Sequence, residues 1–147
     1  MNAIILNALT GAVTEYARHN FHGITPTHGG GALGLFEFGG DTDAGLPIVA
    51  QVQLPTTLRD GDTRKTSIEG VYFSMQGSGE MQLDVAGPSP TLWSYKFPVR
   101  ASGQSRCQVG RGIRENYMGF GLSNPDGQHF SLDQIEVLAS KSKTRRV

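Results

Sequence analysis

The stretch YMGFGLSNPDGQHFSLDQIEVL, residues 117–138, carries most of the information that decides the fold. In its first part Met118, Phe120 and Leu122 are spaced two apart with glycines between them, which is the pattern of a strand with one apolar face. The NPDG that follows places a proline with fixed φ and a glycine that tolerates positive φ in the order that suits a type I turn. The stretch therefore predicts two strands joined by a tight turn, whose polar residues have a structural task.

The second of these strands changes phase partway along. Phe130 and Leu132 have even numbers, whereas Ile135 and Val137 have odd ones. A bulge or bend at residues 133–134 would bring all four side chains to the buried face, because a slip of one residue turns a side chain to the opposite side of the sheet.

Period-two alternation recurs along the chain. Residues 71–75 and 81–85 alternate on either side of a GSG and predict a hairpin, and further strands are predicted within 2–16, 33–38, 48–54 and 93–99. Eight or nine short strands punctuated by glycine predict an all-β fold, a single-domain antiparallel β-sandwich or jelly roll. A chain of 147 residues suits one domain, and we place the sandwich at 1–140 and a basic C-terminal tail at 141–147.

Charge and hydropathy exclude several classes of protein. Thirteen basic and thirteen acidic residues give a net charge of zero, so we expect no direct contact with nucleic acid and no acidic membrane partner. No segment approaches the roughly 20 apolar residues that cross a bilayer. The N-terminus lacks the basic flank and long apolar run of a secretory signal, so we expect synthesis and folding in a cytoplasm.

Two clusters of potential metal ligands have simpler explanations. Asp41 and Asp43 resemble the first half of a calcium loop, but the later carboxylate is missing and a turn explains the same residues. His19, His22 and His28 offer three imidazoles for zinc, yet a solvated loop accounts for them and no second-sphere carboxylate is evident. We expect no cofactor and no metal, and ion binding by either cluster is the alternative.

The sequence offers no complete catalytic constellation. There is no Gly-x-Ser-x-Gly turn, and the single cysteine, Cys107, lies between Arg106 and Gln108 in a predicted loop. Arg106, Arg111 and Arg114 would lower its pKa if they lay close by, but no base accompanies the thiol. We therefore expect a protein that is not an enzyme and has no catalytic residues.

The basic residues near the C-terminus are candidates for a subunit interface. Arginine presents a rigid, planar fork that suits interface ion pairs, and phosphate binding is the alternative use. The candidate interface residues are Arg111, Arg114, Lys141, Lys143, Arg145 and Arg146.

Several blocks of the chain together resemble a known family. They are GGDTDAGLPIVAQVQLP (39–55), GDTRKTSIEGVYFSMQGSGEMQLDV (61–85), RGIRENYMGFGLSNPDGQHFSLDQIEVL (111–138) and the terminal RRV. In this order they look like the small virion structural proteins of tailed bacteriophages. The resemblance implies a β-sandwich component of the tail, neck or baseplate, located in the virion and made in the cytoplasm of the bacterial host. Its implied partners are copies of itself in a symmetric ring, as a homo-oligomer, and other virion structural proteins.

Two further functions fit an all-β sandwich of this kind. A carbohydrate- or receptor-binding module of the tail tip would bind a host-surface glycan and would expose aromatic side chains on loops or on an outer sheet face. The aromatic residues that would test this are Tyr16, Phe21, Tyr72, Trp93 and Tyr117. A capsid decoration protein would instead occupy lattice sites on the shell.

Overall fold

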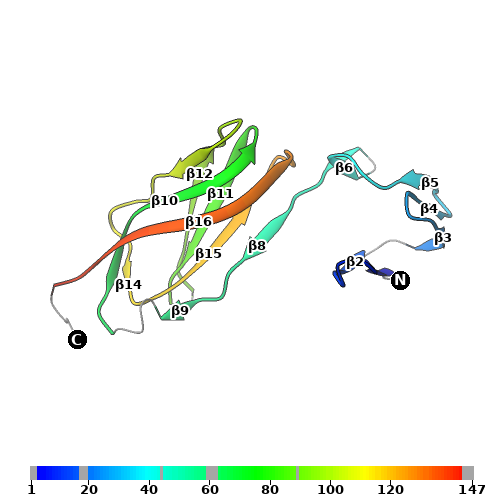
Figure 1. Ribbon diagram of the computed structural model, residues 1–147. Coiled ribbons are helices and arrows are strands. Elements are labelled where there is room, and N and C mark those ends of the chain that lie inside the picture. Colours follow the sequence, from blue (N-terminus) through cyan, green and yellow to red (C-terminus); the bar gives the residue numbers. More distant parts are fainter. Residues whose placement is uncertain (1–2, 17–19, 44, 59–62, 89, 144–147) are drawn as a thin grey trace. The chain divides into compact units, whose positions relative to one another are not determined.

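The computed structural model describes residues 3–16, 20–43, 45–58, 63–88 and 90–143, and every regular element within these ranges is a β-strand (Figure 1). All of the strand pairs are antiparallel. The predicted all-β antiparallel fold is confirmed. The contacts divide the chain into two compact units, Met1–Gly40 and Asp41–Val147, and each is described by itself.

The first unit consists of two small antiparallel sheets. Asn7 closes the turn of the first sheet, because its Oδ1 accepts hydrogen bonds from the backbone N–H of Leu9 (2.9 Å) and Thr10 (3.2 Å). The first sheet pairs β1 (Ala3–Leu6) with β2 (Val13–Tyr16), and the second is formed by β3 (Phe21–Ile24), β4 (His28–Gly31) and β5 (Gly34–Glu37). The strands predicted within 2–16 and 33–38 are present.

The second unit opens with a short hairpin and continues as two sheets. The hairpin pairs β6 (Thr42–Asp43) with β7 (Leu46–Pro47). In the four-stranded sheet, β10 (Thr66–Gly77) pairs along one side with β16 (Phe130–Lys141) and along the other with β13 (Gln104–Cys107) and β14 (Arg114–Glu115). The five-stranded sheet runs from β12 (Leu92–Pro98) through β11 (Glu80–Ala86) and β15 (Tyr117–Ser123) to β8 (Gln51–Gln53), with β9 (Thr57–Leu58) also on β15.

The two sheets of the second unit face each other across one hydrophobic core, as in a β-sandwich (Figure 1). The Phe73 ring on β10 stacks on the Phe97 ring on β12 with 4.7 Å between centroids, so the two sheets are in direct contact. Burying each large apolar side chain contributes roughly 1.5–3 kcal/mol. The buried core residues are Ile68, Val71, Phe73, Met75, Met81, Leu83, Val85, Phe97, Cys107, Val109, Ile113, Met118, Phe120 and Leu122.

The predicted hairpin of residues 71–75 with 81–85 is wrong. These residues lie on β10 and β11, which belong to different sheets, and the chain crosses between the sheets through Gly79 at φ 76°. Alternation reports which face of a strand is apolar, but not whether the next strand lies beside it or opposite it. Here the apolar faces of the two strands meet across the core.

The NPDG turn likewise connects the two sheets. Gly127 N–H donates to the Asn124 carbonyl (2.9 Å), and Gly127 has φ 74°, which suits glycine at the end of the turn. A Cβ there would also collide with Pro47. The turn ends β15 in one sheet and leads into β16 in the other.

The predicted bulge in the last strand is confirmed. Ser74 lies opposite Gln134, whereas the next residue, Met75, lies opposite Leu132, so Asp133 is an extra residue in β16. The insertion corrects the phase of the strand. All four apolar residues in question pack against the core: Phe130, Leu132, Ile135 and Val137.

The sandwich has different limits from the predicted 1–140. Its sheets lie within the second unit, and residues 1–40 form a compact unit of their own. At the other end, Lys141 is the last residue of β16, opposite Thr66, so the predicted tail begins inside a strand. The strand predicted at 48–54 is shortened to β8, and its residues are exposed because they lie at the edge of the sheet.

Candidate functional site

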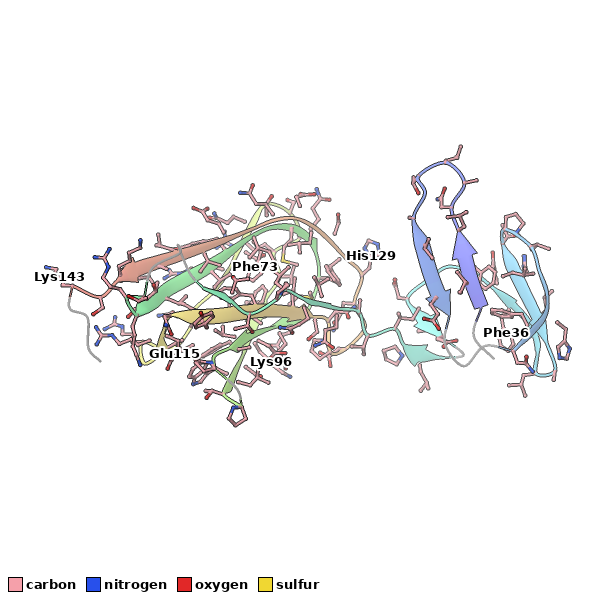
Figure 2. All side chains as sticks on the ribbon, turned by 90° about the horizontal axis from the view of Figure 1, so that it is seen from below. Phe36, Phe73, Lys96, Glu115, His129 and Lys143 are labelled. Carbon is pink, nitrogen blue, oxygen red and sulfur yellow. The ribbon has the colours of Figure 1, made fainter. Side chains whose placement is uncertain are left out.

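Two of the candidate interface residues lie at one end of the four-stranded sheet. Arg114 on β14 lies opposite Ser67 and its Nε donates to the Ser67 Oγ (3.2 Å), while Lys141 on β16 lies opposite the adjacent Thr66. Both therefore flank the start of β10. Lys143 is exposed at the same end (Figure 2), and Arg111 is exposed in the turn before β14. Arg145 and Arg146 lie outside the described residues.

A carboxylate accompanies these basic residues. Lys65 Nζ lies 3.7 Å from Glu115 Oε2, with the lysine side chain half exposed. A surface pair of this kind contributes about 0–1 kcal/mol, so it orders the side chains more than it stabilises the fold. We call Lys65, Arg114, Lys141 and Lys143 the basic end of the sandwich. Its position on the surface suits contact with an acidic surface.

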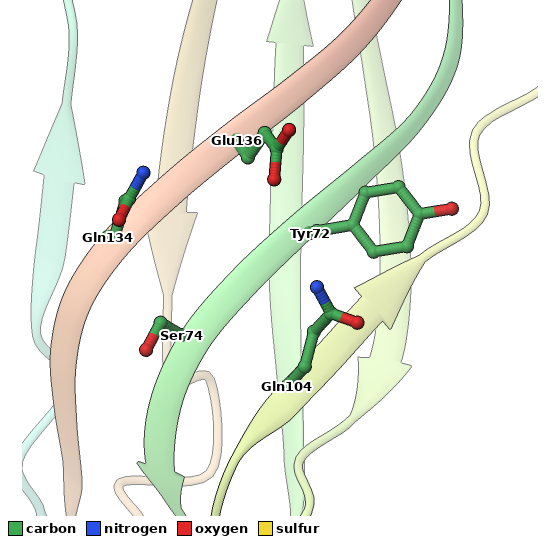
Figure 3. A pocket seen from close by; sticks show the side chains of 5 residues that line it. All are labelled: Tyr72, Ser74, Gln104, Gln134 and Glu136. Carbon is green, nitrogen blue, oxygen red and sulfur yellow. The ribbon is translucent and has the colours of Figure 1, made fainter.

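A second polar surface lies on the outer face of the four-stranded sheet. A shallow hollow of about 150 Å³ opens there across three neighbouring strands (Figure 3). Strand register builds it, because Ser74 lies opposite Gln104 on one side and Gln134 on the other, and Tyr72 lies opposite Glu136. We call this surface the polar hollow, and it is lined by Tyr72, Ser74, Gln104, Gln134 and Glu136.

The polar hollow carries groups that can form hydrogen bonds with a hydroxylated ligand. Its amides, hydroxyls and carboxylate supply donors and acceptors, and its lining contains no histidine or cysteine. The Arg106 guanidinium carbon lies 5.5 Å from the centroid of the Tyr72 ring, a cation–π contact beside the hollow. The hollow is smaller than the roughly 300–1,000 Å³ of sites that enclose small molecules.

Sequence reasoning singled out Tyr72 in the polar hollow and missed its other four residues. The available signal was their alternation: these side chains occupy the outward positions of strands whose inward positions are apolar. Knowledge of which strands lie side by side was also needed to group these residues, and the expected hairpin paired β10 with the wrong strand.

The aromatic residues expected in a glycan-binding module lie in different environments. Tyr72 lines the polar hollow and Tyr117 is exposed. Trp93 is partly buried against the core, and Phe21 packs edge to face on Phe38, with 5.6 Å between centroids. The side chain of Tyr16 lies outside the described part of the structure.

The aspartates of the candidate calcium loop lie in and next to the β6–β7 hairpin. Asp43 lies opposite Leu46, Gly45 in the turn has φ 86°, and the Asp41 carbonyl accepts the N–H of Ile48 (3.1 Å). This is the turn that the sequence predicts.

The candidate zinc residues are only partly described. His19 lies outside the described residues, His22 is exposed on β3, and His28 Nδ1 lies 3.0 Å from the Thr27 hydroxyl. Within the described ranges, no group of three or more His, Cys, Asp or Glu is placed to hold a metal ion.

Cys107 lies in a strand and not in the predicted loop. It is the last residue of β13, opposite Val71, and it is fully buried in the core. Burial raises the pKa of the Cys107 thiol to about 11. Arg106 is not placed to lower this pKa, because its guanidinium contacts Tyr72 on the outer face while the thiol faces the core.

This burial has a measurable consequence at alkaline pH. The thiol keeps its proton in the folded protein but loses it in the unfolded chain above about pH 9, so the stability that it contributes is lost between pH 9 and 11. We expect this loss to reach about 2–3 kcal/mol, at about 1.4 kcal/mol per pKa unit. Urea unfolding of the native protein and Cys107→Ala across this range measures it. Parallel pH profiles of the two proteins would contradict the prediction.

Comparisons with protein-family models, with curated proteins and with solved structures found no match to this chain. None of the described residues belongs to a helix long and apolar enough to span a membrane.

Proposed function

We propose that this chain is a non-enzymatic structural protein of a bacteriophage virion, an oligomeric building block of the tail, neck or baseplate. Its task is to make contacts between subunits, with copies of itself in a symmetric ring and with other virion proteins. The buried, protonated thiol of Cys107 agrees with a structural task.

One observation carries the proposal, namely the distribution of exposed apolar side chains. Among the residues whose burial the structure describes, all of the exposed large hydrophobic ones lie between Ile4 and Leu54, apart from Leu92, Tyr117 and Leu138. Among the described residues of the first unit, Gly29 alone is buried. The exposed large hydrophobic residues of this unit are Ile4, Leu6, Leu9, Val13, Ile24, Leu33, Leu35 and Phe36.

Among its described residues, the first unit therefore has strands but no buried large hydrophobic side chain. Burying each of its exposed apolar side chains would contribute up to about 1.5–3 kcal/mol, which corresponds to roughly 60–120 Å² per side chain at 25 cal/mol per Å². Eight such residues approach the roughly 800 Å² per partner of a stable protein interface. A surface of this size is what an assembly subunit needs and what an isolated monomer rarely exposes.

The sandwich supplies the complementary part of such a subunit. Its core is complete, so it holds its shape independently of its neighbours, and its basic end presents exposed cations. Chain segments and sheet edges that would be a hazard in a monomer serve as joints between identical copies.

We expect Leu33→Asp with Leu35→Asp to weaken self-association of the full chain by about tenfold or more, because charge replaces two apolar contacts. Sedimentation velocity over a range of concentrations measures the association. Leu92→Asp is the matched control, since Leu92 is exposed on the sandwich, and it should leave association unchanged. A monomeric wild-type chain, or equal effects of both variants, would count against the proposed role of the first unit.

The particle itself tests the function most directly. A density map of the intact virion that contains this chain in a ring of the tail, neck or baseplate would support the proposal. Many copies spread over the shell would identify a decoration protein instead, and absence from the purified virion would refute both.

The polar hollow favours one second candidate, a carbohydrate- or receptor-binding module. Tyr72 and its amide and carboxylate neighbours are chemically suited to a polyhydroxylated ligand on an open sheet face. Binding of host-cell polysaccharide by the isolated protein, lost on Tyr72→Ala, would favour this function over a purely structural one.

A further inference from the structure

β16 forms an edge of the four-stranded sheet. It pairs with β10 along its length, and no other described strand pairs with it. Its twelve residues make a long edge, and such edges are commonly shortened, bulged or covered because their unpaired N–H and C=O groups bind further strands. After the bulge at Asp133, the segment 134–141 has no further inserted residue. This segment of β16 is thus where a partner strand can add to the sheet.

The side chains of this segment leave both faces of the strand partly uncovered. On the inward face Ile135 and Val137 are only partly buried, whereas Val71 and Phe73 beside them on β10 are fully buried. On the outer face Leu138 is 46% exposed among polar neighbours, and it lies near the middle of the segment. Leu138 is the one large apolar residue that the outer face of β16 presents.

We propose that β16 pairs in antiparallel orientation with β16 of a second copy of this chain, with Leu138 on the two-fold axis. The inference rests on the proposed function, in which copies of the chain assemble, and it names one joint of that assembly. When the two-fold axis passes through a residue, each residue lies opposite one that faces the same side of the sheet. The inward faces of both strands therefore stay on the same side.

The sequence of β16 fits this register. Leu138 faces its own copy, Glu136 faces Ser140, and Ile135 faces the aliphatic stem of Lys141. No two like charges lie opposite each other in this register. Like charges in opposite positions would destabilise the strand pair. An axis at Val137 instead places Glu136 opposite Leu138, so the self-complementary arrangement is the one centred on Leu138.

The resulting interface is isologous, since the same edge is used by both copies, and it closes after two chains. Two four-stranded sheets then form one continuous sheet through the pair.

Leu138→Cys tests the register directly. Residues directly opposite in antiparallel strands have Cα atoms about 4.5–5.5 Å apart, which lies within the roughly 4.4–6.8 Å of disulfides. We expect the oxidised full chain to form a covalent dimer that reduction separates. Buried Cys107 should contribute no background, because its thiol stays protonated. Glu136→Cys is the matched control, since its two copies would lie about 13 Å apart at 3.3 Å per residue, and it should form no dimer.

A second variant tests the energy of the pairing. Leu138→Lys places two like charges opposite each other and should weaken association about tenfold or more, while the melting temperature at concentrations where both proteins are dissociated stays unchanged. If the chain self-associates but neither Leu138 variant has its effect, the inference is overturned and the proposed function stands. If the chain is monomeric at all concentrations and absent from virions, both are overturned.

Discussion

Replacing Phe73 by alanine is expected to lower the free energy of unfolding of the sandwich by about 4 kcal/mol, within the 3–5 kcal/mol typical of Phe→Ala in a core. Phe73 is fully buried on β10 and its ring stacks on Phe97 of the opposite sheet, 4.7 Å between centroids and 9° between planes. The substitution removes apolar burial, a ring contact and the main bridge between the sheets. Urea unfolding followed by the fluorescence of Trp93, the single tryptophan, measures the loss.

Leu92→Ala is the control for this prediction. Leu92 lies on β12, in the sheet opposite Phe73, and 59% of its surface is exposed. Its truncation should lower the free energy of unfolding by less than about 0.5 kcal/mol. A loss below about 1 kcal/mol for Phe73→Ala would show that the two sheets do not share this core.

Asn124→Ala is expected to lower the stability of the sandwich by about 3 kcal/mol. Asn124 is buried, and its side chain makes three hydrogen bonds: Oδ1 accepts from the Ala50 N–H, and Nδ2 donates to the carbonyls of Gln128 (2.8 Å) and Ile48 (3.3 Å). Each hydrogen bond contributes about 1 kcal/mol net, and a buried group left without its partner costs about 1–3 kcal/mol. Urea unfolding at neutral pH measures the change.

Asp126→Ala provides the comparison within the same turn. Asp126 is exposed, so its truncation should change stability by less than about 0.5 kcal/mol. Equal stabilities for Asn124→Ala and the native protein would mean that the turn holds its shape without the amide, through the backbone hydrogen bonds of residue 124 with Gly127 and Ala50.

The contacts of Asn124 also show the structural role of the polar residues in NPDG. They reverse the chain, as the sequence predicts, but the asparagine additionally fixes the segment Ile48–Ala50 to the turn. That second task involves partners 74 and 76 positions away along the chain. With partners so far away in sequence, the residues of the turn give no indication of this second role.

The candidate sites also depend partly on local sequence and partly on contacts between distant segments. Cys107 was predicted in a loop but lies in a strand, where its sequence neighbour Arg106 contacts Tyr72 on the outer face and the thiol faces the core. The polar hollow was largely missed because its residues come from three strands that only pairing brings together. Arg114 and Lys141 were both candidates, and their placement on either side of β10 follows from the sheet.

By itself the sequence determined the fold class, the apolar face of each core strand and even the bulge at Asp133, because these depend on alternation, turn chemistry and phase within a few residues. Only the tertiary structure decided which strands are neighbours, that β10 and β11 lie in opposite sheets, and that residues 1–40 form a compact unit of their own. Two strands with the same apolar pattern can bury it side by side or face to face. Which of these occurs depends on how all the strands share one core, and local patterns carry no record of that.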